Sequence, residues 1–363
     1  MTALSTDHWA YLTVPPKGRG QFKAEPEDFI VIEDLGYELT GDGEHIFVFI
    51  EKRNLNTAFV AEQLASFTGL PLRNITYAGR KDKYGVCRQW FGIHAPGVKS
   101  FPWEACTIEG VNIIKVARHN KKLRTGQLKG NTFIIRLRHV ENIEDVTAKL
   151  DIAWQQGVPN YFGEQRFGVQ RLGDDGELRK GGNLALAERM INGETIKNRN
   201  KRSMALSALR SWLFNEVISQ RIASSHFDNI MLGDAIGLTG SNSFFSNDGS
   251  DTDLVSRYQQ GDVCPTAPLW GKGKAATTSD AHAFEDSVTS QYSEVLACLE
   301  NAGLKQERRQ IRLWPKGLAY QVQEQDLVVS FNLPSGCFAT SVLRECVVTY
   351  EKSSSGDTNE TSA

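Results

Sequence analysis

Strand-like sequence at both ends of the chain encloses a helical middle, and this order limits the folds open to it. At both ends apolar residues alternate or cluster as they do in strands, over residues 22–33, 45–52, 75–78, 89–94, 113–117, 132–137, 327–331 and 346–350. In the middle, residues 203–222 place Leu206, Leu209, Leu213 and Val217 at helical spacing. A strand-rich unit at both ends with a helical middle predicts one domain inserted into another.

Helices are also expected outside the central segment. Residues 57–67 have apolar residues at helical spacing, with Thr57 as a candidate N-cap and Gly69 as a stop. Residues 145–156 predict a second helix, and residues 284–299 a weaker one. Residues 239–280 are rich in Gly, Ser, Thr and Asp with little periodicity, and residues 266–271 are expected to form a structured loop. The first 155 residues therefore predict a mixed α+β unit.

One carboxylate stands out in the sequence Asn74-Ile-Thr-Tyr-Ala-Gly-Arg-Lys-Asp-Lys83. An apolar, β-prone run ends in Ala-Gly, and Asp82 follows between Arg80, Lys81 and Lys83. Small residues allow another backbone or a ligand to approach closely. The cations favour the ionised carboxylate, which suits an anion or a nucleophile better than a general acid, and they attract a polyanion. A solvated charge cluster would have the same composition, so these ten residues leave both interpretations open.

Further motifs extend this signal along the chain. In order they are Ala78-Gly-x-Lys-Asp82, Gln89-Trp-Phe91, Lys129-Gly-Asn-Thr-Phe133, Pro159-Asn-Tyr-Phe-Gly-x-Gln-Arg-Phe-Gly168 and Leu333-Pro-Ser-Gly-x-Phe-Ala-Thr-Ser-Val-Leu-Arg-Glu345. In this order and spacing they resemble the tRNA pseudouridine synthase D family, over residues 22–345 or nearly the whole chain.

The resemblance implies a fold. It implies the α+β class, with a pseudouridine synthase catalytic domain built on a mixed or antiparallel sheet and interrupted by an inserted α/β domain. The expected boundaries are residues 1–159 and 304–351 for the catalytic domain and 160–303 for the inserted one. Residues 352–363 are small and polar, and we expect them to be a disordered tail.

The resemblance also implies an activity, the isomerisation of uridine 13 in the D-arm of tRNA to pseudouridine. Asp82 would be the catalytic aspartate, acting on the ribose or the base as a nucleophile or as a base. The reaction breaks the N1–C1′ bond and rejoins the base through C5, so no cofactor is expected. The sequence agrees with this expectation, because it has no Walker A pattern and no Rossmann glycine fingerprint.

A flipped-out uridine needs an aromatic surface and hydrogen bonds to its edge. By resemblance Phe29, Asn131 and Phe338 contact the substrate, although Phe29 could be an ordinary core residue and Asn131 a turn residue. Phe133 lies two residues after Asn131, hence on the same strand face, and we expect it to pack against the base. Lys23 and Lys81 are candidates to keep Asp82 ionised or to contact the RNA backbone.

Two clusters have structural interpretations as well. Tyr161, Phe162, Gln165 and Arg166 lie at the expected domain junction, where they could position RNA or fix the junction; we favour the structural role. Arg344 and Glu345 are expected to form an internal ion pair.

Charge is separated along the chain, although the net charge is only −2. Residues 25–44 are acidic, whereas residues 115–138 and 197–210 contain basic residues and no acid, and residues 305–316 are mostly basic. Each basic run could be a solvated face, but three of them in a chain of net negative charge favour a polyanion footprint. The resemblance implies that this polyanion is tRNA. No obligate protein partner is expected, and the protein is expected to act as a monomer.

Localisation and redox state follow from simple patterns. No apolar run reaches the roughly 18 residues of a membrane span, and residues 1–16 lack a signal-peptide pattern, so a cytoplasmic protein is expected. The six cysteines form no Cys-x-x-Cys pair and do not cluster with His at zinc spacings, which predicts reduced structural thiols and no bound metal.

Two other classes of protein remain open. One is an RNA-binding or chaperone protein that uses the same basic cleft without turnover. The other is an Asp-dependent hydrolase of a phosphate or glycosidic substrate, for which a second carboxylate near Asp82 or a metal would be expected. Residues 70–100 contain no other acid, which argues against the hydrolase.

Overall fold

The computed structural model describes residues 4–98, 100–168, 171–172, 178–179, 182–241 and 243–350. The expected tail, residues 352–363, lies outside the described residues. The chain divides into two compact units. The sheet unit comprises Pro16–Asp151, Pro315–Gly336 and the described part of Cys346–Ala363. The helical unit comprises Ile152–Trp314, Cys337–Glu345 and the described part of Met1–Pro15.

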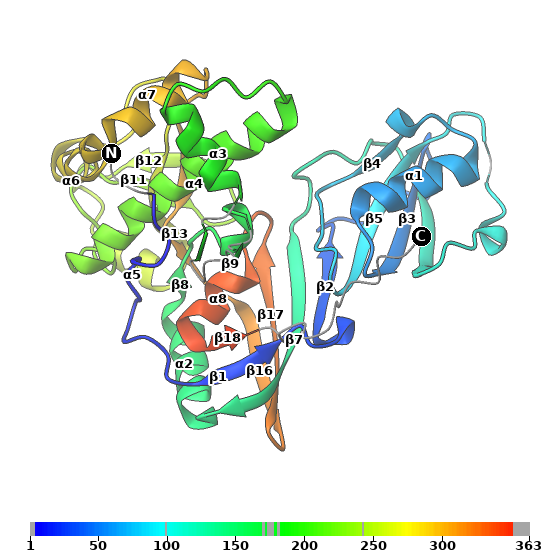
Figure 1. Cartoon of the computed structure of the whole chain (residues 1–363), viewed down its shortest axis with the longest axis horizontal. Coiled ribbons are helices and arrows are strands. Elements are labelled where there is room, and N and C mark those ends of the chain that lie inside the picture. Colours follow the sequence, from blue (N-terminus) through cyan, green and yellow to red (C-terminus); the bar gives the residue numbers. More distant parts are fainter. Residues whose placement is uncertain are drawn as a thin grey trace, which may run out of the picture. The chain divides into compact units, whose positions relative to one another are not determined.

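The sheet unit is built on one large, mostly antiparallel sheet (Figure 1). Its strands follow the order β16 (Lys316–Gln323), β17 (Asp326–Pro334), β7 (Gly130–Glu141), β2 (Phe29–Asp34), β5 (Val86–His94), β3 (His45–Arg53) and β6 (Val111–His119). Off this path, β1 (Arg19–Phe22) pairs with β7 and β18 (Val348–Tyr350), and β4 (Ile75–Tyr77) pairs with β5. The β2–β5 and β1–β18 pairs are parallel, so the sheet is mixed.

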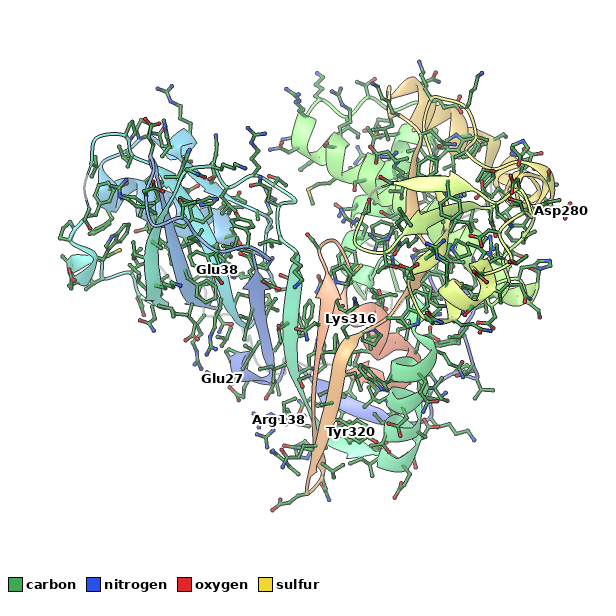
Figure 2. All side chains as sticks on the ribbon, turned by 180° about the vertical axis from the view of Figure 1, so that it is seen from behind. Glu27, Glu38, Arg138, Asp280, Lys316 and Tyr320 are labelled. Atoms are coloured by element: carbon green, nitrogen blue, oxygen red, sulfur yellow. The ribbon has the colours of Figure 1, made fainter. Side chains whose placement is uncertain are left out.

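Short helices complete the sheet unit. They are α1 (Thr57–Thr68), the first part of α2 (Ile143–Gln156), and the 3₁₀ turns η1 (Pro26–Asp28), η2 (Leu72–Asn74) and η3 (Trp103–Ala105). One face of β3 and β5 packs under α1 through Ile50, Leu64 and Phe91, which are fully buried. Arg138 of β7, labelled in Figure 2, forms an ion pair with buried Asp28 at 2.9 Å and so ties η1 to the sheet.

The helical unit surrounds the long helix α4 (Arg199–Ala223), whose buried residues include Trp212 and Phe214 (Figure 1). Around it lie α3 (Gly182–Ile191), α5 (Leu254–Gln259), α6 (Ser279–Thr289), α7 (Ser293–Asn301), α8 (Ala339–Cys346) and the 3₁₀ turns η4 (Glu164–Arg166) and η5 (Ser290–Tyr292). A small sheet has the order β12 (Phe244–Ser246), β11 (Ala235–Leu238), β13 (Val263–Leu269) and β14 (Glu307–Gln310). Two short pairs join β8 (Val158–Pro159) to β15 (Arg312–Leu313) and β9 (Arg171–Leu172) to β10 (Leu178–Arg179).

The mixed sheets and helices confirm the predicted α+β class. Several element boundaries differ from the prediction. The strand expected over residues 22–33 is two strands, β1 and β2, because Pro26 starts the η1 turn between them. The helix expected over 284–299 is divided by η5, where the Tyr292 hydroxyl donates to Glu216 and its ring packs on Trp212.

Two further expectations were wrong in detail. The structured loop expected over residues 266–271 is largely strand β13, which pairs with both β11 and β14. Thr57 is the first helical residue of α1 and not its N-cap, which is Asn56. Gly69 does end α1 in the left-handed conformation, with φ at +68°. The chain passes from the sheet unit to the helical unit after Asp151 and returns to the sheet unit after Trp314. The boundaries of an inserted domain stay a prediction.

Candidate active site

Asp82 lies in the loop that joins β4 to β5, and side chains of β3 and β5 bind the backbone of this loop. The Lys52 ammonium donates to the carbonyl oxygens of Asp82, at 2.6 Å, and of Leu55, at 2.7 Å. The Cys87 thiol points to the same Asp82 carbonyl at 3.5 Å. Lys52 is fully buried, whereas the Asp82 side chain keeps 29% of its surface exposed. The loop therefore fixes the backbone of Asp82 and leaves its carboxylate accessible.

Burial changes the proton affinity of the groups under this loop. It lowers the pKa of Lys52 and raises the pKa of Cys87, because a buried site disfavours the charged form of each. The two residues lie directly opposite each other on β3 and β5. Together they hold the Asp82 carbonyl oxygen from two neighbouring strands.

Lys23 is the cation that lies beside the Asp82 carboxylate. Its ammonium is 3.5 Å from Asp82 Oδ1, and its side chain is only 12% exposed. The same ammonium lies 4.1 Å from the centre of the Phe29 ring, close enough for a cation–π contact. The residue follows β1 in the left-handed conformation, with φ at +57°. The structure thus brings three of the predicted residues, Lys23, Phe29 and Asp82, together.

Lys81, in contrast, contacts a different carboxylate from the one expected. Its ammonium lies 2.7 Å from Oε1 of Glu33, whose side chain is fully buried. The other oxygen of Glu33 accepts the Trp90 backbone N–H at 2.7 Å. Burial raises the pKa of Glu33, an effect larger than the opposing influence of Lys81. Lys81 therefore anchors the Asp82 loop to β2 through Glu33.

The position of Glu33 follows from a fork in the sheet. Along one side of β5, strand β2 pairs with residues 86–88 and strand β4 with residues 91–93. The Trp90 amide lies in the gap between these two pairings, and the Glu33 carboxylate occupies the place of a strand partner. This fork is the point from which the Asp82 loop leaves the sheet.

The first residue of α1 also holds the loop. The hydroxyl of buried Thr57 donates to Oε1 of Gln89 at 2.9 Å and accepts the Lys81 backbone N–H at 3.0 Å. The Asp82 loop is therefore fixed on both sides of the carboxylate by side chains from β2, β3 and α1.

Aromatic rings and one amide share the same face of the sheet. Glu33 and Val31 of β2 lie opposite Asn131 and Phe133 of β7, so all four point to one face. The rings of Phe29 and Phe133 lie 6.2 Å apart, between centroids. The expectation that Asn131 and Phe133 occupy one strand face is confirmed by this register.

Asn131 is the unusual member of this face. It is 8% exposed, and among the described residues its Oδ1 has no hydrogen-bond partner. A buried amide oxygen that stays unpaired costs free energy and needs an explanation. An N–H donor of a bound ligand would satisfy it.

Two glycines show where backbone must approach closely. Gly85 has φ at +135°, and a Cβ there would lie 2.6 Å from the Phe29 carbonyl oxygen, so the loop can return to β5 only with glycine at this position. At Gly79 a Cβ would meet nothing within 4 Å. No described backbone therefore approaches Gly79 closely, and the approach of a ligand there stays a prediction.

Phe338 belongs to the helical unit, not to the sheet unit that carries Asp82. Its ring lies 5.8 Å from that of Phe162 and 5.7 Å from the Arg166 guanidinium. The expected contact of Phe338 with the substrate uridine stays a prediction.

The other motif residues of the helical unit are largely internal. The buried Tyr161 hydroxyl donates to the Ala10 carbonyl at 2.9 Å, and the Phe162 backbone exchanges two hydrogen bonds with the Asn215 side chain. Both support the structural role predicted for this segment. The predicted ion pair of Arg344 and Glu345 is confirmed, at 2.5 Å.

The sequence analysis did not identify Glu33, Lys52, Thr57, Cys87 or Gln89 as parts of the site. A signal for two of them was present. Glu33 continues the buried face of Phe29 and Val31, and Lys52 continues that of Val48 and Ile50. A charged residue in phase with the apolar face of a strand is a candidate for a buried, functional contact.

None of the described helices is both long enough and apolar enough to cross a membrane. Among the described residues, no three His, Cys, Asp or Glu side chains gather in a group that could hold a metal ion.

Comparisons with known proteins give a consistent result. The model of the family described as tRNA pseudouridine synthase D matches residues 6–175 and 191–346. The tRNA pseudouridine synthase D of Pseudoalteromonas atlantica is 49% identical over 342 residues, which cover 94% of this chain and 96% of that protein. The Aeromonas hydrophila protein of the same name is 46% identical over 336 residues, 93% of each chain.

A solved structure has a similar fold. The crystal structure of a putative tRNA pseudouridine synthase D from Methanosarcina mazei superimposes with a TM-score of 0.71, covering 93% of this chain and 95% of that one. At 22% sequence identity, this similarity supports the fold assignment alone.

Proposed function

The chain belongs to the tRNA pseudouridine synthase D family, and we propose that Asp82 is the carboxylate with which it isomerises uridine 13 in the D-arm of tRNA. As a member of this family it is an isomerase that forms pseudouridine in tRNA. The observation that carries the assignment to Asp82 is its geometry. An accessible carboxylate stands on a rigidly held loop, 3.5 Å from a lysine, at the edge of a face with aromatic rings and an unpaired amide.

The reaction requires little beyond such a carboxylate and a base-binding surface. The N1–C1′ bond of uridine breaks, the uracil turns, and a C5–C1′ bond forms. C5 loses its proton to solvent and N1 gains one, so atoms and charge balance without an oxidant or a transferred group. Asp82 would assist either as a nucleophile toward the nucleotide or as a base, and Lys23 would stabilise its charge.

The surrounding residues suit a flipped-out uracil. Asn131 Oδ1 would accept the N3–H of uracil, a donor that cytosine lacks. Phe133 and Phe29 would supply apolar surface to the ring. Phe338 of the helical unit would be the third aromatic contact, and Lys81 would act indirectly, through its pairing with Glu33.

A tritium-release assay tests the proposal. The purified protein is incubated with tRNA transcripts tritiated at uridine C5, because C5 loses its hydrogen only when it becomes the glycosidic carbon. We expect release from a transcript with uridine 13 and none when cytidine replaces that uridine. Asp82→Asn should abolish release while tRNA binding, measured by filter retention, stays within a few fold.

Asp42→Asn is the matched control, because it makes the same change at an exposed aspartate of the same unit. It should leave release unchanged. Full activity of Asp82→Asn would remove Asp82 from the mechanism. Tight binding without release by the wild-type protein, on every transcript, would instead favour an RNA-binding protein without turnover.

The setting of this activity is part of the proposal. We place the protein in the cytoplasm, where tRNA is modified, and expect it to act as a monomer without a protein partner. We also retain the inserted-domain arrangement, with residues 160–303 as the inserted part. Size-exclusion chromatography with light scattering, at the concentrations used for the assay, tests the monomer.

A further inference from the structure

Two arginines in the helical unit share an aromatic neighbour. The guanidinium of Arg309, on β14, lies 4.4 Å from the centre of the Phe162 ring, and that of Arg166, in η4, lies 5.3 Å from it. Arg309 donates to the side-chain oxygen of Asn160 at 2.6 Å, and Arg166 donates to the Ser207 hydroxyl at 3.0 Å. The Ser207 hydroxyl is neutral, so it orients the Arg166 guanidinium without balancing its charge.

Arg166 differs in this respect from other arginines of the same unit. Arg221, Arg308 and Arg312 form ion pairs with Asp234, Glu285 and Asp228, respectively. Among the described residues, Arg166 has no carboxylate partner, and its buried Nε has no hydrogen-bond partner. Burial and then the positive charge of Arg309 lower the pKa of Arg166. Arg166 thus lies next to a second cation, whereas Arg221, Arg308 and Arg312 are each neutralised by an acid.

A bound anion would give the Arg166 Nε–H a hydrogen-bond partner and would balance the charge of the guanidinium. A guanidinium presents several N–H donors in a planar fork that matches two oxygens of a phosphate. The Nε–H of Arg166 is one such donor, and an oxygen placed there would also reduce the repulsion from Arg309. Arg166 also lies 5.7 Å from the ring of Phe338, the residue that we expect to contact the target uridine.

We propose that Arg166, with Arg309 beside it, binds a backbone phosphate of the tRNA substrate. The ligand class is a phosphodiester of RNA. The assignment rests on the proposed function for the identity of the RNA and on the two arginines for the site itself. Arg166 would therefore contribute to tRNA affinity, whereas a purely structural arginine would contribute to folding.

The test compares Arg166→Gln with Arg189→Gln. Arg189 is an exposed arginine of the same unit, and its side chain is already paired with Glu194, so both variants lose one charge. For Arg166→Gln we expect tRNA affinity to fall by roughly tenfold, as for loss of a charge-assisted contact. The slope of log affinity against log salt concentration should decrease by about one, the change expected for one phosphate contact. Arg189→Gln should change neither quantity.

Melting temperature separates the proposed role from a structural one. The Tm of free Arg166→Gln should stay within about 2 °C of wild type, because the substitution also removes the repulsion from Arg309. Arg166→Lys, which keeps the charge but loses the fork, should restore the salt slope but only part of the affinity. A large fall in Tm with unchanged affinity and slope would show that Arg166 is structural and overturn the proposal.

The same experiment keeps this proposal distinct from the function of Asp82. Tritium release is measured for the wild-type protein on the same tRNA. Release by wild type, together with an unchanged salt slope in Arg166→Gln, would refute the phosphate site alone. A reduced slope in Arg166→Gln, without any release by wild type, would support the phosphate site and refute the assigned reaction.

Discussion

At the residue scale, the most informative side chain is that of Lys52, which is too deeply buried for RNA to contact. Lys52 is fully buried, and its ammonium binds the carbonyl oxygens of Asp82 and Leu55. We predict that Lys52→Met lowers kcat for pseudouridine formation and leaves tRNA affinity nearly unchanged, because the loop loses its support but the RNA loses no contact. The free energy of unfolding should fall by about 1–3 kcal/mol, since two carbonyl oxygens lose a charged donor.

Single-turnover kinetics, filter binding and urea denaturation measure the three quantities. Lys316→Met is the matched control, because Lys316 is an exposed lysine of the same unit, on β16 (Figure 2). A Lys52→Met protein that is destabilised yet has normal kcat would show that Lys52 serves the fold only.

Gly85 gives a second residue-scale prediction. Gly85→Ala should destabilise the protein by roughly 1–3 kcal/mol more than Gly41→Ala, because its Cβ would press on the Phe29 carbonyl at 2.6 Å. Gly41 also has a positive φ, at +83°, but a Cβ there meets nothing within 4 Å, so the difference reports the contact at Gly85 together with the greater backbone strain of its φ at +135°. Thermal melting of both variants measures the difference in destabilisation. Equal destabilisation by the two substitutions would mean that the backbone before β5 shifts to accommodate the new Cβ without displacing Phe29.

The residues of the site were predictable from the sequence in unequal degree. Asp82, Asn131 and Phe133 lie in short motifs, and the period of two was enough to place the last two on one strand face. The partner of Lys81 was not predictable in the same way. Its ion pair with Glu33 joins residues 48 positions apart, and only the parallel pairing of β2 with β5 brings them together.

At the element scale, the fork of β2 and β4 along β5 decides how the Asp82 loop is mounted. The Glu33 carboxylate fills the fork and binds Lys81. We predict that Glu33→Gln and Lys81→Met each destabilise the protein by about 3–5 kcal/mol, because each leaves a buried group without its partner. The double variant should be destabilised by less than the sum of the two.

A double-mutant cycle by urea denaturation measures this coupling. The exposed pair of Arg189 on α3 and Glu194 beyond its end provides the reference cycle, in which a much smaller coupling is expected. Additive effects at Glu33 and Lys81 would show that the two side chains act separately and that the fork does not hold the loop.

Elements were predicted well where one local signal dominated and poorly where distant contacts decided. Gly69 ends α1 as expected, because its left-handed conformation is a local property. Thr57 was expected to cap the same helix, but its hydroxyl is used by Gln89 and the Lys81 amide. The division between α6 and α7 likewise depends on contacts of Tyr292 with α4, which the pattern of residues 284–299 does not contain.

At the scale of the whole molecule, some residues of the basic runs form ion pairs within the protein, whereas others are exposed to solvent. Arg136 and Arg138 are paired with Asp326 and Asp28, and Arg308 and Arg312 are paired within the helical unit. Arg308 and Arg312 of the run over 305–316 are therefore used internally, whereas Lys305 and Lys316 of the same run are exposed. The exposed basic residues between β6 and β7 are different, because Lys121, Lys122 and Arg124 all reach solvent.

These exposed residues give the last prediction. Replacing Lys121 and Lys122 together by Gln should weaken tRNA binding and decrease its salt slope by about one for each lost phosphate contact, while kcat at saturating tRNA stays unchanged. The fold should tolerate the change, since exposed side chains contribute little to stability. Lys272 and Lys274, which are exposed in the helical unit, provide a double Gln control with the same loss of charge. Equal weakening by both double variants would mean that net charge, rather than the β6–β7 connection, attracts the RNA, and an unchanged slope in the first would place the RNA path elsewhere.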